Sequence, residues 1–352
     1  MSTQGMFMEN NKQLKKKPVC LALQGGGAYG AYSWGILDKI LEDDRLEIDA
    51  ISATSAGSVN AVILANGFIK GGNEGAREAL NDFWTSLSEY GSYLSPVRQM
   101  LPEHLSGIDF CARTTFEVFD DLSHVVSPYI LNPFNFNILR IILQNKINFD
   151  RLRDKNLIHL FLCATNIKSG KLKVFENDEV SVDAVMASAC LPHLNQAVEI
   201  NNEYYWDGGF IGNPPIFPLI YNSLVDDIIV IHNNPIVRDS IPVTSHEIEN
   251  RTNEITFNSS LMRELRAMHF VTNLITKDML KEEHKDSIRL KLTHMIRSDE
   301  VMNQFSMMDK YKWRLDFLLN LRDLGRKVAD EWLETNFKYI GVKSTIDFSE
   351  FL

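Results

Sequence analysis

The chain has 352 residues, of which 45% are hydrophobic, and this is enough to bury one large core or a core with a helical extension. Its formal net charge of −10 argues against a basic face for nucleic acid and against non-specific attraction to anionic lipid. No run of about 18 consecutive apolar residues occurs, so the sequence predicts no segment that spans a membrane.

The first 17 residues are polar and end in three consecutive lysines. They contain no apolar stretch before a cleavage site, so we expect a disordered tail at 1–17 and no secretory signal peptide. The four cysteines lack the paired spacing of a zinc site, which is typical of reduced thiols in a cytoplasmic protein. These cysteines are Cys20, Cys111, Cys163 and Cys190.

Two strand–turn–helix units follow, and small residues fill both turns. Apolar runs predict strands at 19–23 and 48–51, with helices after them at 28–41 and 56–65. The second turn holds Ser55, with the small residues Ala53 and Gly57 two positions away on either side. This pattern predicts a nucleophile elbow, in which the serine hydroxyl is exposed at a tight turn in front of a helix.

The first turn holds three consecutive glycines, Gly25, Gly26 and Gly27. Their N–H groups can converge beside the N-terminus of the next helix and bind a phosphate or a developing oxyanion. Gly30 completes a Gly-x-Gly-x-x-Gly pattern, and Glu42 or Asp43 has the spacing of the acidic residue that binds ribose in dinucleotide-binding proteins. Neither acidic residue closes a second strand, which argues against a nucleotide site. A further alternative is that the glycines only form a tight turn in an α/β sheet and bind no ligand.

Residues 91–147 form an insertion that is broken by prolines and rich in aromatic and aliphatic residues. One interpretation is a helical subdomain with its own small core. The other is a lid or acyl-binding wall that contacts lipid. The candidate substrate-binding side chains are Phe134 and Phe136, and Leu139 and Ile142 are candidates for the same lipid contact.

The remaining apolar runs complete the predicted elements. Strands are predicted at 158–164, 172–175, 227–231 and 287–296, a hairpin at 198–206, and helices at 75–90, 180–190, 245–280 and 311–337. This alternation predicts an α/β fold with a mainly parallel sheet flanked by helices on both faces. We expect a catalytic α/β domain at 18–235 and a helix-rich C-terminal extension at 236–352 that packs on it.

Three ordered motifs resemble the signatures of the patatin-like phospholipases. The motifs are Gly25-Gly-Gly-Ala-Tyr-Gly30, Ala53-Thr-Ser-Ala-Gly57 and Asp207-Gly208-Gly209. The resemblance implies a patatin-like fold and a Ser–Asp dyad made of Ser55 and Asp207. It also implies that the glycine turn, Gly25, Gly26 and Gly27, forms the oxyanion hole.

Two positions depart from the family pattern. Ala53 replaces the usual glycine of the elbow, so strain is stored there unless φ is negative. Tyr29 stands where the family often has arginine or lysine, so this cation is absent from the turn itself. Because of the change at position 53, a non-catalytic or regulatory lipid-binding module on the same fold is the alternative function.

The expected function is that of a lipid acyl hydrolase of the phospholipase A or lysophospholipase type. Asp207 takes the proton of the Ser55 hydroxyl, an acyl-enzyme forms, and the glycine turn with the N–H of Ala56 stabilises the oxyanion. This chemistry requires no cofactor and no metal. A histidine base, His232 or His193, is the alternative to the dyad. The expected partner is a phospholipid or another acyl ester, at a membrane that the protein contacts peripherally.

Overall fold

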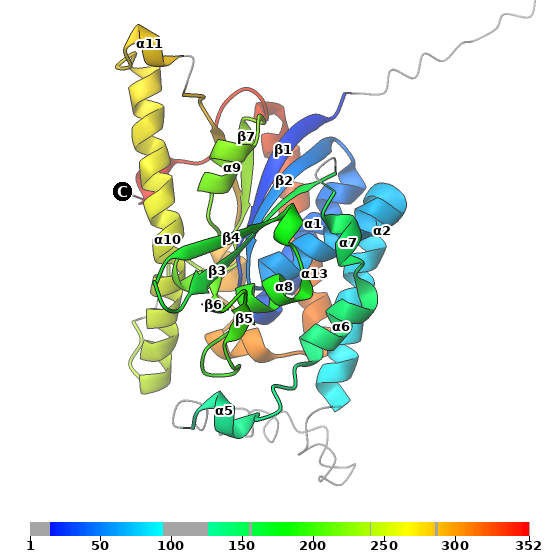
Figure 1. The fold of residues 1–352 in the computed structure, drawn as a ribbon. Helices are drawn as coiled ribbons and strands as arrows, with labels where there is room; N and C mark the ends of the chain where they lie inside the picture. Colours follow the sequence, from blue (N-terminus) through cyan, green and yellow to red (C-terminus); the bar gives the residue numbers. More distant parts are fainter. Residues whose placement is uncertain (1–14, 94–125, 155–156, 240, 286–287, 352) are drawn as a thin grey trace, which may run out of the picture.

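A computed structural model describes residues 15–93, 126–154, 157–239, 241–285 and 288–351. In these residues one mixed sheet has the strand order β5-β6-β3-β2-β1-β7-β8, and β4 pairs with β3 (Figure 1). The strands β1, β2, β3, β7 and β8 are parallel, whereas β4, β5 and β6 pair antiparallel. The strands are β1 (Lys17–Leu23), β2 (Leu46–Thr54), β3 (His159–Asn166), β4 (Leu172–Glu176), β5 (Val198–Ile200), β6 (Glu203–Asp207), β7 (Asp227–Ile231) and β8 (Leu292–Ile296).

Helices cover both faces of this sheet (Figure 1). The helices are α1 (Gly30–Asp43), α2 (Ala56–Tyr93), α5 (Pro128–Leu131), α6 (Ile138–Lys146), α7 (Phe149–Leu152), α8 (Val182–Ser188), α9 (Phe217–Asn222), α10 (Ser245–Thr276), α11 (Glu282–Lys285), α12 (Asp299–Met302) and α13 (Leu315–Asn336). Short 3₁₀ turns that border the site are η1 (Gly27–Tyr29), η3 (Gly208–Phe210) and η4 (Met307–Tyr311). On one face lie α1, α2 and α13, and on the other lie α9 and α10.

Strand β1 shows how the two layers divide the apolar residues. Val19, Leu21 and Leu23 belong to the larger core, which α1, α2 and α13 cover. Cys20 and Ala22 point the other way, into a smaller core with residues of α9 and α10. Both faces are therefore buried, as the continuous apolar run required. The predicted α/β class, a mainly parallel sheet with helices on both faces, is confirmed.

The glycine pair after the elbow helix separates two helical stretches, as the sequence predicts. Between the predicted helices 56–65 and 75–90, Gly71 and Gly72 lie at non-helical backbone angles, and φ at Gly72 is +61°. The range α2 therefore comprises two helices that meet at this kink, where glycine adopts the left-handed conformation without a steric penalty.

The last third of the chain contributes to the sheet as well as to its cover. Strand β8 pairs in parallel with β7 and extends the sheet at that edge. Helix α13 crosses α1 so closely that a Cβ on Gly35 would clash with the backbone of Arg322, and one on Gly325 with the carbonyl of Tyr32. The C-terminal part therefore packs on β7 and on α1.

The predicted insertion is only partly visible, because residues 94–125 lie outside the described residues. Helix α6 packs inward, and Ile142 and Leu143 are buried in the larger core. The expected lipid contact of Ile142 is therefore wrong, since its side chain is core. Phe134 and Phe136, by contrast, are 92% and 53% exposed.

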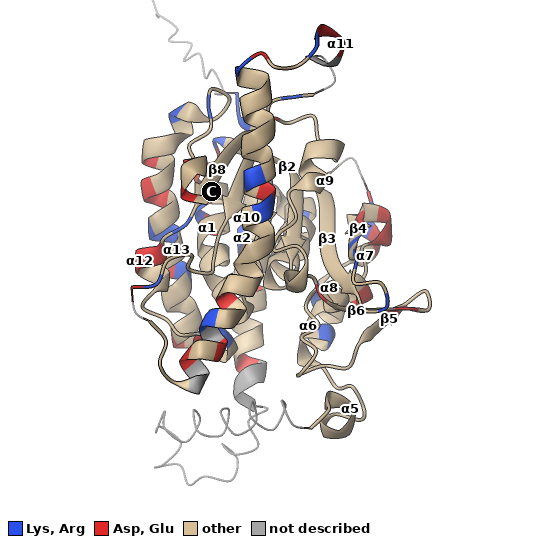
Figure 2. Ribbon diagram, turned by 90° about the vertical axis from the view of Figure 1, so that its left-hand side faces the viewer, with Lys and Arg blue, Asp and Glu red and all other residues tan. Residues whose placement is uncertain are grey.

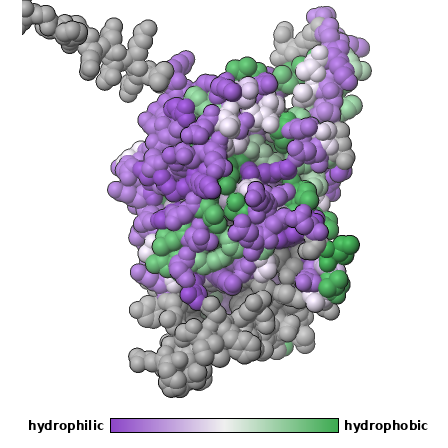
Figure 3. Space-filling view, turned by 180° about the vertical axis from the view of Figure 1, so that it is seen from behind, coloured by the Kyte–Doolittle hydropathy of each residue, from purple (hydrophilic) through white to green (hydrophobic). Residues whose placement is uncertain are grey.

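Charged residues of both signs occur on α10 and α13 (Figure 2). Hydrophobic residues on the face turned away in Figure 1 occur in small groups among hydrophilic ones (Figure 3). Within the described parts of the chain, no helix is both long and apolar enough to cross a bilayer.

Candidate functional site

Ser55 occupies the turn between β2 and α2, where the sequence placed the elbow. Its φ is +55°, a left-handed conformation that costs energy for a residue with a Cβ. The Ser55 N–H donates to Ser188 Oγ at 2.9 Å, and Ser188 Oγ shares a 2.8 Å hydrogen bond with Ser58 Oγ. Helix α8, which ends at Ser188, therefore holds the elbow in its strained form. Sequence reasoning did not single out Ser188.

The two small residues that flank Ser55 have different roles. Ala53 lies in β2 opposite Leu23 of β1, and it is not among the residues with positive φ. An alanine fits there, so the departure from the family's glycine stores no backbone strain at position 53. Gly57 is required, because a Cβ there would collide with the carbonyl oxygen of Leu23.

The glycine turn lies directly beside the elbow. A Cβ on Gly25 would stand 2.7 Å from Ser55 Cβ and 3.2 Å from Asn213 Oδ1. The N–H of Gly25, one of the expected oxyanion donors, is occupied, because it donates to Asn213 Oδ1 at 2.7 Å. The N–H groups of Gly26 and Gly27 have no hydrogen-bond acceptor among the described residues. Gly27 has φ +59° and begins η1.

Asp207 ends β6, and its carboxyl group is fully buried. Its Oδ1 accepts the Gly209 N–H at 2.7 Å, whereas Oδ2 has no hydrogen-bond partner among the described residues. Burial raises the pKa of Asp207 to about 6, and the Gly209 N–H and the Ser55 side chain act in the opposite direction. The Ser55 side chain is therefore near enough to act on the Asp207 carboxyl, one of whose oxygens has no hydrogen-bond partner in the described part of the chain.

Buried amide side chains form a hydrogen-bond network next to the glycine turn. Gln24 Oε1 accepts the backbone N–H groups of Asn233 at 2.8 Å and Asn234 at 3.0 Å. Asn234 Nδ2 donates to the Gly25 carbonyl at 3.0 Å, and Gln24 Nε2 donates to Asn258 Oδ1 at 2.9 Å. Gln24 follows β1, Asn233 and Asn234 follow β7, and Asn258 lies in α10. No local sequence pattern predicts that these amides meet.

The two histidines of the alternative mechanism have different environments. His232 is buried, and its Nε2 is 3.1 Å from Asn258 Oδ1, within the amide network. Burial lowers the pKa of His232 to about 4, so its ring is neutral at pH 7. His193 is exposed. Neither histidine is among the groups that shift the pKa of Asp207.

The nucleotide interpretation also fails on geometry. Gly30 serves packing, because a Cβ there would lie 2.9 Å from both the Ala56 Cβ and the Trp84 ring. Glu42 forms ion pairs with Arg77 at 3.0 Å and Arg326 at 2.7 Å. It lies at the far end of α1, roughly 18 Å along the helix from Gly30.

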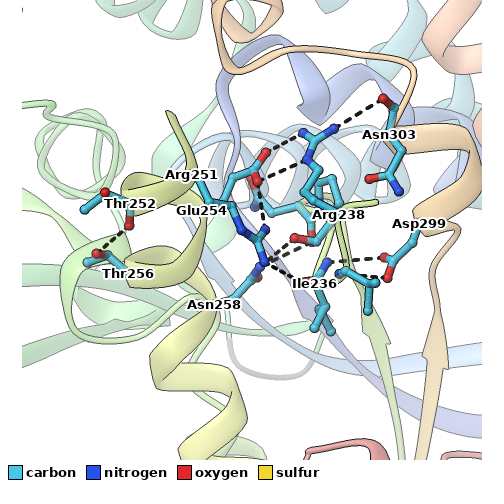
Figure 4. A network of polar contacts seen from close by, with 12 residues as sticks. Ile236, Arg238, Arg251, Thr252, Glu254, Thr256, Asn258, Asp299 and Asn303 are labelled. Carbon is cyan, nitrogen blue, oxygen red and sulfur yellow. Dashed lines mark hydrogen bonds and ion pairs between the residues drawn. The ribbon is translucent and has the colours of Figure 1, made fainter. Parts of the chain in front are cut away.

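A buried ion cluster fixes α10 against the site (Figure 4). Glu254 of α10 accepts from Arg238 at 2.5 Å and from Arg251 at 3.0 Å. The Arg238 guanidinium also donates to the carbonyls of Asn303 and Phe305, both at 3.2 Å. The cluster therefore joins three segments: the chain after β7, helix α10, and the stretch that leads into η4.

The candidate substrate-binding residues stand apart from the dyad. Phe134 and Phe136 follow α5, which lies at the end of the molecule toward which the parallel strands run (Figure 1). Both side chains are exposed to solvent, and no contact with Ser55 is found within the described segments. Phe134 and Phe136 therefore stay candidates for contact with lipid.

Residues 21–220 match the family model described as patatin-like phospholipase. VipD from Legionella pneumophila is similar in structure at 15% identity and a TM-score of 0.34, covering 88% of this chain and 67% of that one. The ExoU–SpcU complex of the Pseudomonas aeruginosa type III secretion system gives 15% identity and a TM-score of 0.36, with 92% and 52% covered.

The chain thus spans between half and two thirds of the length of those two solved chains. No curated protein sequence matches it. The family match includes the glycine turn, the elbow and the aspartate motif, and it takes in more than half of the 352 residues. The chain therefore belongs to the patatin-like phospholipase family, whose members are lipid acyl hydrolases.

Proposed function

We propose that the protein hydrolyses acyl esters of lipids with Ser55 as nucleophile and Asp207 as general base. One observation supports this assignment most strongly. Among the residues that the structure describes, none forms a hydrogen bond with Oδ2 of the buried Asp207 carboxyl, and the Ser55 side chain is close enough to lower its pKa. A base needs a lone pair that is not already used, and its pKa should lie near the working pH.

The reaction proceeds in two halves. The Ser55 hydroxyl proton passes to Asp207 while Oγ bonds to the acyl carbon, and the carbonyl oxygen takes the negative charge. The tetrahedral species collapses, the bond to the alcohol breaks, and the departing alcohol takes the proton from Asp207. Water then attacks the acyl-enzyme with Asp207 again as base, which releases the fatty acid and restores Ser55.

The developing oxyanion is assigned to the N–H groups of Gly26, Gly27 and Ala56. The first two have no acceptor among the described residues, and Ala56 is the first residue of α2. A helix N-terminus carries partial positive charge, so α2 adds to the stabilisation. Each such donor is worth about 10²–10³ in rate.

The proposed substrate is a phospholipid or related acyl ester at a membrane surface. The exposed Phe134 and Phe136 would insert into the lipid, so that binding depends on apolar burial, at roughly 25 cal/mol per Å². With a net charge of −10, the protein gains no overall electrostatic attraction to anionic lipid.

The test measures hydrolysis of a fluorogenic short-chain ester and of vesicle phospholipid by wild type and variants. Ser55→Ala and Asp207→Asn should each reduce kcat/KM by at least about 10³, as expected for residues that act as a unit. Ser259→Ala, which removes a hydroxyl that donates to the Thr256 carbonyl on α10, is the matched control. Activity retained in Asp207→Asn but lost in His232→Gln would replace the dyad by a triad.

A further inference from the structure

Lys310 is a buried lysine that packs against the glycine turn. It is 7% exposed, and its carbonyl oxygen lies 2.6 Å from the position that a Cβ on Gly27 would take. Its Nζ donates to Asn234 Oδ1 at 2.5 Å and stands 5.6 Å from the ring centre of Tyr29. The Phe257 ring centre is 5.9 Å from the same nitrogen. The ammonium group is therefore enclosed by residues that border the site.

Two buried carboxylates, Glu254 and Asp207, act on the Lys310 ammonium group. Glu254 and Asp207 favour the ammonium form, and Arg238 disfavours it. Glu254 is already paired with Arg238 and Arg251, whereas Asp207 forms no ion pair among the described residues. The relation is mutual, because Lys310 is also among the groups that lower the pKa of Asp207. A buried cation without such compensation is costly.

Hydrogen bonds connect Lys310 to the oxyanion donors. Lys310 Nζ holds Asn234 Oδ1, which turns Asn234 Nδ2 toward the Gly25 carbonyl at 3.0 Å. On the other side, Asn213 Oδ1 holds the Gly25 N–H at 2.7 Å. In a trans peptide the carbonyl and the next N–H point in opposite directions. Fixing the Gly25 carbonyl toward Asn234 therefore aims the Gly26 N–H away from Asn234.

We propose that Lys310 is a positioning residue of the Ser55 site, and this inference rests on the proposed function. Its ammonium fixes Asn234 and so orients the Gly25–Gly26 peptide, and its positive charge offsets the negative charge that develops during acyl transfer. Lys310 lies outside the family match at residues 21–220. The Tyr29 side chain is uncharged, and the cation over its ring is Lys310, which lies far from it in the sequence.

The test compares pH profiles of kcat and KM for the soluble ester in wild type, Lys310→Met, Lys310→Arg and Lys291→Met. Lys291 is the matched control, since it is also buried, and its Nζ donates to the Ser223 and Val225 carbonyls, outside the network that supports the glycine turn. Burial lowers the pKa of Lys310 to about 8, so wild-type kcat should fall as pH rises through about 8. Tyr29 does not titrate there, because burial raises its pKa far above this range.

In Lys310→Met, kcat at pH 7 should drop about tenfold to hundredfold, KM should change little, and the alkaline fall should vanish. Lys310→Arg should keep part of kcat and move the alkaline fall above about pH 10, because a guanidinium stays charged. Lys291→Met should leave both kcat and the alkaline fall as in wild type.

The proposal is overturned if Lys310→Met keeps wild-type kcat, or if the alkaline fall near pH 8 persists in that variant. Should Lys310→Met not fold, an unshifted alkaline fall in Lys310→Arg overturns it equally. If the wild-type protein hydrolyses no ester, both the proposed function and this inference are wrong. If wild type is active and Ser55→Ala loses that activity, but Lys310→Met has wild-type kcat, the inference about Lys310 is wrong and the proposed function stands.

Discussion

Gly25 lies against Ser55 so closely that a Cβ at position 25 would stand 2.7 Å from Ser55 Cβ and 2.9 Å from the Thr54 carbonyl oxygen. Real Cβ atoms do not approach other atoms at such distances, so Gly25→Ala must displace the turn or the elbow. We expect this variant to lose about 10² or more of kcat/KM, because a shift of about 1 Å in catalytic geometry has that effect.

Gly341→Ala is not a suitable control for that change, since φ at Gly341 is +76° and alanine would be strained there. Gly71→Ala is better, because Gly71 has open space around it and its φ is negative. Near-wild-type kcat/KM in Gly25→Ala would mean that the turn has room to move and that the close approach is not functional.

Asp207 is predicted to reduce stability while it supports activity. Burial raises its pKa from 3.8 to about 6, so the folded state holds this proton more tightly than the unfolded chain does. The resulting stabilisation is fully present below about pH 4 and is lost as pH rises through about 6. We expect Asp207→Asn to raise the free energy of unfolding at pH 7 by roughly 1–3 kcal/mol, from the size of the shift.

Urea denaturation of wild type and Asp207→Asn at pH 7 and pH 4 measures this effect. The difference between the two proteins should be larger at pH 7 than at pH 4. A variant less stable than wild type at pH 7 would show that the carboxylate forms interactions in the folded state that outweigh its burial.

The same pKa fixes the acidic side of the activity profile. A general base must be ionised, so kcat for the soluble ester should fall as pH drops through about 6. His232 gives no fall in this range, because its pKa is lowered to about 4. A stopped assay across pH 4–8, with folding monitored in parallel by tryptophan fluorescence, measures the midpoint. An acidic midpoint that moves in His232→Gln would point to the histidine instead.

Phe134 and Phe136 provide the test of membrane contact. Replacing both by serine should reduce hydrolysis of vesicle phospholipid about tenfold while a soluble ester is hydrolysed nearly as before, because the two side chains are exposed. Leu224→Ser, at a position that is 83% exposed and distant in sequence, is the control. Equal losses on both substrates would make the segment structural. A collapse of vesicle binding at high salt would assign the contact to the lysines at 15–17.

Local patterns predicted those parts of the site that are contiguous in the sequence. Ser55 and the glycine turn each follow a buried strand, and chain geometry alone places small residues there. The hairpin before Asp207 was also readable, since Asn201 and Asn202 adopt the left-handed conformation that asparagine tolerates, with φ of 55° and 64°.

The supporting polar groups could not be predicted in this way. Asn213, Asn234 and Lys310 are buried polar residues whose partners are 76 to 209 residues away in the sequence. A single buried amide or lysine produces no repeating sequence pattern. Because lysines are mostly exposed, the residue type alone predicts a surface position for Lys310. Only the packing of η4 on Gly27 brings it to the turn.

Because the ribosome synthesises the chain from its N-terminus, η4 is made long after Ser55. At about 5–20 residues per second, the chain needs roughly 10–50 seconds to proceed from Ser55 to Lys310. During that interval Ser55 has been synthesised, but β8, the Glu254 cluster and η4 are incomplete. The nascent chain therefore spends its synthesis without the segments that brace its own reactive serine, and a product truncated near residue 235 would remain in that state.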